Sequence, residues 1–211
     1  GAGVRVGILE PGQVYNTHDN LPGVVYQGAV NADDFSEHTL AVASIIGARG
    51  PGLATGSAGV APGVTLRSGS TTGVDIINMS AGGGSLTVPL VDALIEANPR
   101  VTFVKSAGNR GTSPGNNTTV PAMSPNIITV GALNRDFTRR ADFSSFSDGA
   151  SPIKPDLMAP GEYVNAAQSR DVDNNARTDD FGRVFLGDDF TRAGATTGSI
   201  TGTSFAAPHV S

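Results

Sequence analysis

Residues 202–210 of the chain read Gly-Thr-Ser-Phe-Ala-Ala-Pro-His-Val. Proline lacks a backbone N–H and is tolerated only in the first turn of a helix, so Pro208 predicts a helix that begins near Ser204 or Phe205. At a helix N-terminus, unpaired amides and the positive end of the helix dipole can stabilise a developing oxyanion. Ser204 is therefore a candidate nucleophile, and the alternative is a serine that only caps the helix.

The longer string GTSFAAPHVS resembles the nucleophile motif of the subtilisin-like serine proteases, the subtilases. Residues 74–83, 105–109 and 154–161 resemble further motifs of this family, in the same order along the chain. The similarity covers most of the chain except residues 168–201. It implies a three-layer, doubly wound α/β fold with a mostly parallel sheet. It also implies a serine endopeptidase that forms an acyl-enzyme on Ser204.

The hydrophobic pattern independently indicates an α/β protein. Short apolar runs alternate with helix-like stretches, and such a rhythm is typical of parallel sheets whose sites form at the carboxyl ends of strands. On the helix predicted for residues 38–48, we expect Leu40, Val42, Ile45 and Ile46 to form one apolar stripe. The predicted strands are residues 4–9, 74–79, 101–105, 127–130 and 163–166, and a second helix is predicted for residues 86–97.

Length and a hydrophobic content of 38% predict a single domain over residues 1–211, and the resemblance implies that it is a subtilisin-like peptidase domain. Residues 168–201 are polar and acidic, so they are interpreted as a surface insertion with a hairpin around residues 181–189. Residues 60–78 are too few for a strand, a helix and a further strand, which indicates that a family helix is missing. The chain ends at Ser211, so we expect either a fragment or a shortened version of the fold.

A serine hydroxyl needs a base, usually a histidine oriented by a carboxylate. The chain has three histidines. His38 begins a predicted helix and matches the catalytic histidine of the family, which makes it the predicted general base. Thr39 follows it where the family has glycine. His209 would point away from Ser204 on the same helix, and His18 is predicted to be a surface residue.

Glu10 ends the first predicted strand where the subtilases carry aspartate. We predict that Glu10 orients His38, although its extra methylene requires a shift of about 1.5 Å in the strand end or the ring. Two alternatives stay open. Asp33 or Asp34 could supply the carboxylate, or Glu10 could be inert.

Asn109 follows a predicted strand and is assigned to the oxyanion hole, with a turn-forming asparagine as the alternative. Small residues after two strands suit the walls of a cleft in which a peptide pairs as an added strand. Arg110 stands at the rim where the family often has an acidic residue, which predicts tolerance for an acidic substrate side chain. The predicted substrate-binding residues are Ser80, Ala81, Gly82, Ser106, Ala107 and Gly108.

The net charge of −5 and the lack of Lys and Arg runs argue against nucleic acid or a membrane surface as partner. The expected partners are a polypeptide substrate and either an N-terminal propeptide or a missing C-terminal segment. The chain opens without a signal-like region, so any signal or propeptide is expected to have been removed or left out. The resemblance implies an extracellular or periplasmic location.

The absence of cysteine excludes disulfides, thiolate metal sites and cysteine nucleophiles. We predict no cofactor for the chemistry and no metal at the site. Residues 171–175 leave a structural calcium ion open, although Ala176 and Gly182 exclude an EF-hand.

The main alternative function is a non-catalytic peptide-binding relative or an inactive fragment. The joint presence of Ser204, His38 and Asn109 favours the enzyme, because a peptide-binding module has no physical need for all three residues. An α/β-hydrolase is disfavoured because that fold places its base after the nucleophile, whereas His38 precedes Ser204.

Overall fold

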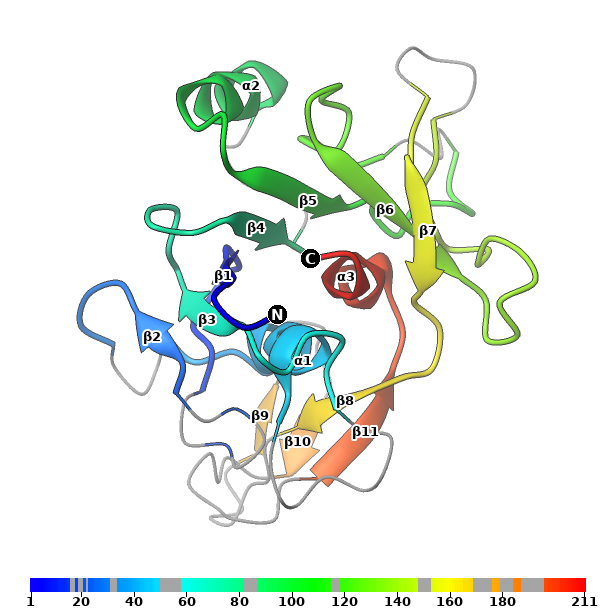
Figure 1. Cartoon of the computed structure of the whole chain (residues 1–211). Helices are drawn as coiled ribbons and strands as arrows, with labels where there is room; N and C mark the ends of the chain where they lie inside the picture. Colours follow the sequence, from blue (N-terminus) through cyan, green and yellow to red (C-terminus); the bar gives the residue numbers. More distant parts are fainter. Residues whose placement is uncertain are drawn as a thin grey trace. The chain divides into compact units, whose positions relative to one another are not determined.

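The computed structural model describes residues 1–15, 18, 21, 23–30, 34–49, 58–81, 87–114, 118–147, 153–168, 176–178, 184–186 and 196–211 (Figure 1). Internal contacts group the chain into two compact units. The first comprises residues 1–73 and 165–199, and the second comprises residues 74–164 and 200–211. That residues 1–211 form one domain stays a prediction.

Three parallel strands form the sheet of the first unit, in the order β2-β3-β1. They are β1 (Arg5–Ile8), β2 (Val25–Tyr26) and β3 (Thr65–Ser68). β1 pairs in register with β3, from Arg5 opposite Thr65 to Ile8 opposite Ser68. Val6 and Ile8 are completely buried, so the predicted strand at residues 4–9 is confirmed with shorter bounds.

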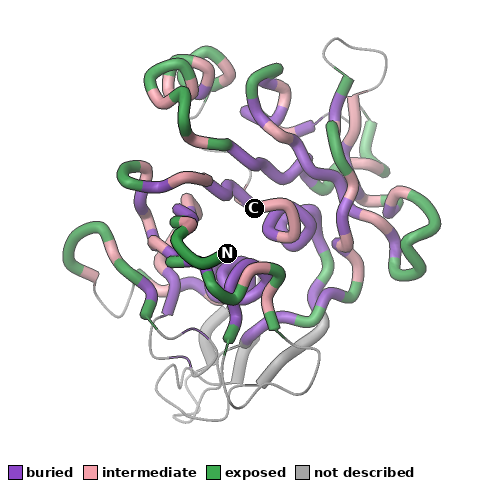
Figure 2. The backbone as a smooth tube through the Cα atoms, viewed as in Figure 1, coloured by how far each residue is buried: buried purple, intermediate pink, exposed green. Residues whose placement is uncertain are grey.

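Helix α1 (Glu37–Gly47) is buried from His38 to its end (Figure 2). The residues of the predicted apolar stripe are therefore buried, and the rest of the helix is buried with them. Several segments of the first unit enclose this helix. Ser44 Oγ accepts a hydrogen bond of 2.9 Å from the Ala167 amide. Gly47 leaves space for Leu66, whose side chain would lie 3.1 Å from an added Cβ. A helix that is buried on all faces needs apolar or small side chains along most of its length. The alanine, serine and glycine residues of α1 fit this requirement.

The strands between residues 164 and 200 form two short two-stranded sheets. β8 (Val164–Gln168) pairs with β11 (Thr196–Ile200), and β9 (Ala176–Thr178) pairs antiparallel with β10 (Val184–Leu186). The hairpin predicted around residues 181–189 therefore has other bounds, because residues 184–186 pair with residues 176–178. The calcium candidate at residues 171–175 lies outside the described residues.

Four parallel strands form the sheet of the second unit, in the order β4-β5-β6-β7. Their carboxyl ends therefore lie at one edge, where polar loops follow. Helix α2 (Val88–Ala97) connects β4 to β5 and buries only Val91. The strands are β4 (Ile76–Met79), β5 (Thr102–Ser106), β6 (Ile128–Leu133) and β7 (Leu157–Pro160).

Helix α3 (Thr203–Ala206) continues as a 3-10 turn, η2 (Ala207–His209), so the predicted helix start is confirmed within one residue. Ala206 and Ala207 are fully buried and pack in one cluster with Val104 and Val130 of β5 and β6. Because these alanines are small, the helix can lie close to the strands. This close packing fixes the position of Ser204, which lies in the same helix.

No helix occurs between β3 and β4, where residues 69–75 form turns and bends. Residues 60–78 thus contain no helix, as expected, and the shortening of the chain relative to its family stays a prediction. Among the described residues, no helix has the length and apolar character needed to cross a membrane.

Candidate active site

Two segments of the first unit are joined by hydrogen bonds that place the start of α1 next to the end of β1. The Gln13 amide donates to the Asp34 carbonyl at 2.6 Å, and the Ser36 amide donates to the Gln13 carbonyl at 3.1 Å. Thr39 Oγ1 donates to the carbonyl oxygens of Pro11 and Gly12 at 3.2 and 3.4 Å. The residue that replaces the family glycine thus fastens the helix to the loop.

Gly12 is required for this close approach. Its φ angle is +87°, a left-handed conformation, and an added Cβ would lie 2.6 Å from Ser36 Cβ. Any larger residue would separate the loop from the N-cap of α1.

Glu10 and His38 meet as a result of this junction. His38 Nδ1 lies 3.4 Å from Glu10 Oε2, with side-chain exposures of 5% and 0%. The Glu10 carboxylate thus reaches the imidazole in spite of its extra methylene. Asp34 is solvent-exposed, and Asp33 lies outside the described residues.

The other two histidines have other surroundings. His18 is only 4% exposed, so its prediction as a surface residue is wrong. The His18 carbonyl accepts the amide of Leu21 at 2.8 Å, and Leu21 is itself only 1% exposed. His209 Nδ1 lies 2.8 Å from the Phe205 carbonyl oxygen, one helical turn back. Burial lowers the pKa of His209 below its ordinary value, and hydrogen bonds of the ring to the backbone of Phe205 and Ala206 oppose this effect.

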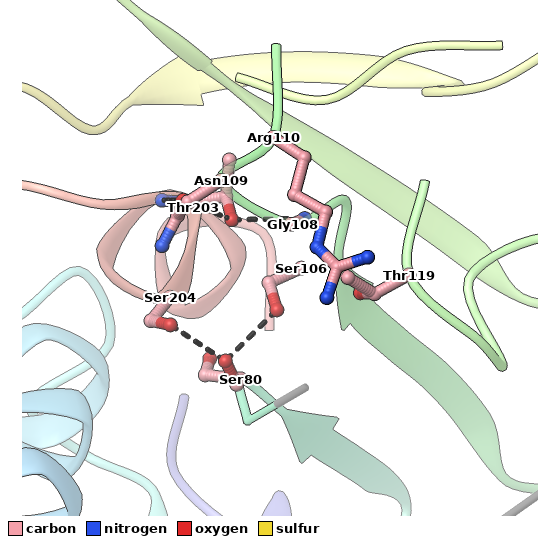
Figure 3. Close-up of a pocket in the computed structure, with 8 residues that line it drawn as sticks. All are labelled: Ser80, Ser106, Gly108, Asn109, Arg110, Thr119, Thr203 and Ser204. Carbon is pink, nitrogen blue, oxygen red and sulfur yellow. Dashed lines mark hydrogen bonds between the residues drawn. The ribbon is translucent and has the colours of Figure 1, made fainter. Parts of the chain in front are cut away.

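Ser204 lies in the first turn of α3 and is 7% exposed. It does not cap the helix, because the N-cap is Gly202 and no side chain makes a capping hydrogen bond there. The Ser204 hydroxyl donates instead to the carbonyl oxygen of Ser80, at the end of β4, over 2.6 Å (Figure 3). The alternative reading of Ser204 as a capping residue is therefore wrong.

Asn109 is held by Thr203, the residue before Ser204. Asn109 Oδ1 accepts the Thr203 amide at 3.0 Å and the Thr203 hydroxyl at 2.9 Å, and that hydroxyl also accepts the Gly108 amide at 3.0 Å. Since both bonds occupy Oδ1, the Nδ2 amide of Asn109 is directed elsewhere and can donate to a substrate oxygen. Sequence reasoning gave Thr203 no role, although it lies inside the recognised motif.

A cavity of about 400 Å³ adjoins Ser204 and Asn109 (Figure 3). Of the predicted cleft residues, Ser80, Ser106 and Gly108 line it, whereas Gly82 lies outside the described residues. Ala81 and Ala107 are absent from its described lining, and Ala107 is completely buried. The other lining residues are Arg110, Thr119 and Thr203.

Lys105 is a second residue that sequence reasoning overlooked. It is 1% exposed at the end of β5, and its Nζ donates to the Ser106 carbonyl at 3.0 Å and to the Ser106 hydroxyl at 2.9 Å. The Ser106 hydroxyl donates in turn to the Ser80 carbonyl at 2.9 Å. A continuous polar chain therefore leads from the buried Lys105 side chain to the acceptor of Ser204. The signal in the sequence was a lysine directly after the apolar run 101–104.

The predicted site residues thus fall into two groups. Glu10 and His38 are together in the first unit, and Ser204 and Asn109 are together in the second. The pairing of His38 with Ser204 stays a prediction.

The profile described as the subtilase family matches residues 1–211. Subtilisin DY of Bacillus licheniformis is 32% identical over 237 aligned residues, which cover 100% of this chain and 74% of that protein. Subtilisin amylosacchariticus of Bacillus subtilis subsp. amylosacchariticus is 34% identical, over 65% of this chain and 29% of that protein.

Two solved structures are also similar to this chain. The structure of the prenylagaramide maturation protease PagA matches with a TM-score of 0.66 at 23% identity. The match covers 98% of this chain and 72% of the PagA chain. The structure of the patellamide maturation protease PatA matches with a TM-score of 0.67 at 24% identity, over 99% of this chain and 75% of the PatA chain. At this identity the two structures bear on the fold alone, and they confirm the predicted α/β class with a mostly parallel sheet.

Proposed function

The chain belongs to the subtilase family of serine peptidases, and from this premise we propose that it is an endopeptidase that cleaves polypeptides through an acyl-enzyme on Ser204. In the proposed reaction, His38 removes the hydroxyl proton as Ser204 attacks the scissile carbonyl, and later returns that proton to the leaving amine. The Glu10 contact at Nδ1 leaves Nε2 as the atom that exchanges the proton.

The observation that carries the proposal is the arrangement of Asn109 beside Ser204. Both line one cavity, and Thr203 fixes the oxygen of the Asn109 amide so that its N–H₂ group is free to donate. An amide fixed before the substrate arrives stabilises an oxyanion without reorganisation, and removing one such donor costs about 10²–10³ in kcat in the subtilisin example of this effect.

Before attack, the Ser204 hydroxyl has to exchange its hydrogen bond to Ser80 for one to the base. This exchange requires rotation about a single side-chain bond, and staggered rotamers of serine interconvert readily. The Ser80 carbonyl therefore holds the nucleophile in a resting orientation.

Covalent labelling by a fluorophosphonate tests the proposal. We expect labelling at Ser204, its loss in Ser204→Ala, and a decrease of several orders of magnitude in rate in His38→Ala. Ser113 provides a matched control because residues 111–113 repeat the tripeptide Gly-Thr-Ser in an exposed turn. Ser113→Ala should label like the parent chain. Labelling at Ser113, or none in a folded protein, would contradict the proposal.

The second candidate is a peptide-binding relative without catalysis. The observation that favours it is the Ser204 hydrogen bond itself, which directs the hydroxyl proton to a backbone carbonyl. A folded chain that binds peptides through the cavity but neither labels nor cleaves would support this candidate.

The proposed chemistry uses side chains and backbone amides and requires no cofactor. A polypeptide substrate, a propeptide or C-terminal segment as partner, and an extracellular or periplasmic location are parts of the same proposal.

A further inference from the structure

The cavity beside Ser204 has one charged side chain among its described lining residues, that of Arg110. The other polar groups are the hydroxyls of Ser80, Ser106, Thr119, Thr203 and Ser204 and the Asn109 amide. In Figure 3 the Arg110 side chain extends from the loop after β5, and its guanidinium is on the side where Ser106 and Thr119 are drawn. A group that enters this cavity therefore meets hydroxyls and one cation.

The backbone that carries Arg110 is fixed on both sides. The Arg110 amide donates to Ser145 Oγ at 2.9 Å, and the Gly111 amide donates to the Phe143 carbonyl at 2.8 Å. Gly108 has a φ angle of +107°, and an added Cβ there would lie 2.6 Å from Thr119 Cγ2. The Arg110 side chain thus leaves the backbone at a defined position on the cavity wall.

The Arg110 guanidinium is also uncommitted, unlike those of two arginines that follow it in the sequence. Arg139 pairs with Asp142, and Arg140 binds the Ser144 carbonyl and stacks over Phe146 at 4.3 Å. Within the described part of the chain, the Arg110 side chain makes no hydrogen bond or ion pair. No described residue occupies its five N–H donors, and the geometry of a guanidinium matches that of a carboxylate.

We propose that Arg110 makes this cavity select glutamate or aspartate as the substrate residue whose carbonyl Ser204 attacks. The inference rests on the proposed function, because it uses the acyl-enzyme geometry. With the carbonyl oxygen at the Asn109 amide and the carbonyl carbon at Ser204, the side chain of that same residue is the one nearest the cavity that both residues line. The chain carries a net charge of −5, so acidic substrates need a local cation such as Arg110 to be favoured.

The selectivity should be moderate because Arg110 is solvent-exposed. Water and salt weaken an exposed ion pair, so we expect a preference of about two- to fivefold for glutamate over the isosteric glutamine. The preference should decrease as ionic strength rises from about 0.01 M to about 1 M, because the Debye length shortens about tenfold.

The test compares kcat/KM for peptides that differ only in the residue before the scissile bond: glutamate, glutamine or lysine. The parent chain should prefer glutamate over glutamine about two- to fivefold at low salt. Arg110→Gln should bring this ratio close to one, Arg110→Lys should keep part of it, and Arg110→Glu should favour the lysine peptide. Arg100→Gln is the matched control, because Arg100 is exposed before the opposite end of β5 and its loss removes the same charge. That control should keep the parent ratio.

The possible results separate the two proposals. If the parent chain cleaves the glutamate and glutamine peptides equally well, or if Arg100→Gln lowers the ratio as much as Arg110→Gln, the role of Arg110 is wrong and the endopeptidase remains. If no peptide is cleaved and Ser204 does not label, both proposals are wrong.

Discussion

The carboxylate of Glu10 is completely enclosed and lies 3.4 Å from the His38 imidazole. In a buried site, a carboxylate stabilises the imidazolium form of histidine more strongly than it would in water. The contact is longer than a charge-assisted hydrogen bond of about 2.7–2.9 Å. Such contacts often shorten only when the substrate is bound.

Replacing Glu10 by glutamine should lower kcat by about 10²–10⁴-fold while KM changes little. Glutamine keeps the shape but lacks the charge that stabilises the imidazolium, which exists only during the reaction. Steady-state kinetics on one peptide substrate would measure this, with the exposed Glu96→Gln on α2 as control. An unchanged kcat in Glu10→Gln would remove Glu10 from the mechanism.

Thr203 offers a second prediction, because its hydroxyl links Asn109 Oδ1 to the Gly108 amide. Thr203→Val should lower kcat about tenfold or more with little effect on KM, since a loosely held Asn109 stabilises the oxyanion less well. Thr203→Ser keeps the hydroxyl and should restore most of kcat. If Thr203→Ser is as impaired as Thr203→Val, the hydroxyl does not position Asn109.

Individual elements were predictable where their residues leave a local signal. Apolar runs indicated β1, β4, β5 and β6, and Pro208 indicated the start of α3. β2, β3 and β7 gave no comparable signal, because β2 has two residues and β3 contains an arginine. β7 ends in a proline, which is disfavoured inside strands.

The burial of α1 on every face could not be predicted from its sequence. Its alanines, serine and glycine are small enough for either an exposed or a buried face, and only the surrounding segments decide which. The same holds for the candidate site. The bonds of Thr203 to Asn109 join residues 94 positions apart, and no local pattern encodes such a contact. The motifs predicted which residues matter, whereas the fold determines what holds them.

At the scale of the whole molecule, the proposed machinery is divided between two compact units. The base and its carboxylate belong to the first, and the nucleophile and its oxyanion donor belong to the second. A catalytic readout therefore reports on both units at once, whereas cavity labelling by a small ligand reports on the second unit alone.

The stability of the folded chain should depend on pH through His209. Burial lowers its pKa below the ordinary value of 6.5, so the unfolded chain binds a proton at a pH where the folded chain does not. This contribution to stability is fully present above about pH 6.5 and is lost as pH falls through the lower folded-state pKa.

Urea unfolding of the parent chain and of His209→Gln between pH 8 and pH 5 would measure this contribution. The free energy of unfolding should decrease less steeply with falling pH in His209→Gln than in the parent chain. Equal slopes in the two proteins would show that His209 does not contribute.

The carbonyl oxygen of Ser80 has two lone pairs, and the hydroxyls of Ser106 and Ser204 occupy both. Ser204→Ala therefore empties one acceptor site in a buried position. A water molecule or a substrate amide would then fill it, since a buried carbonyl with a missing donor is costly. Peptide affinities measured on Ser204→Ala would therefore include the contribution of this new hydrogen bond to the Ser80 carbonyl. Ser204→Cys retains a weak donor at the same place and provides the closer reference for binding.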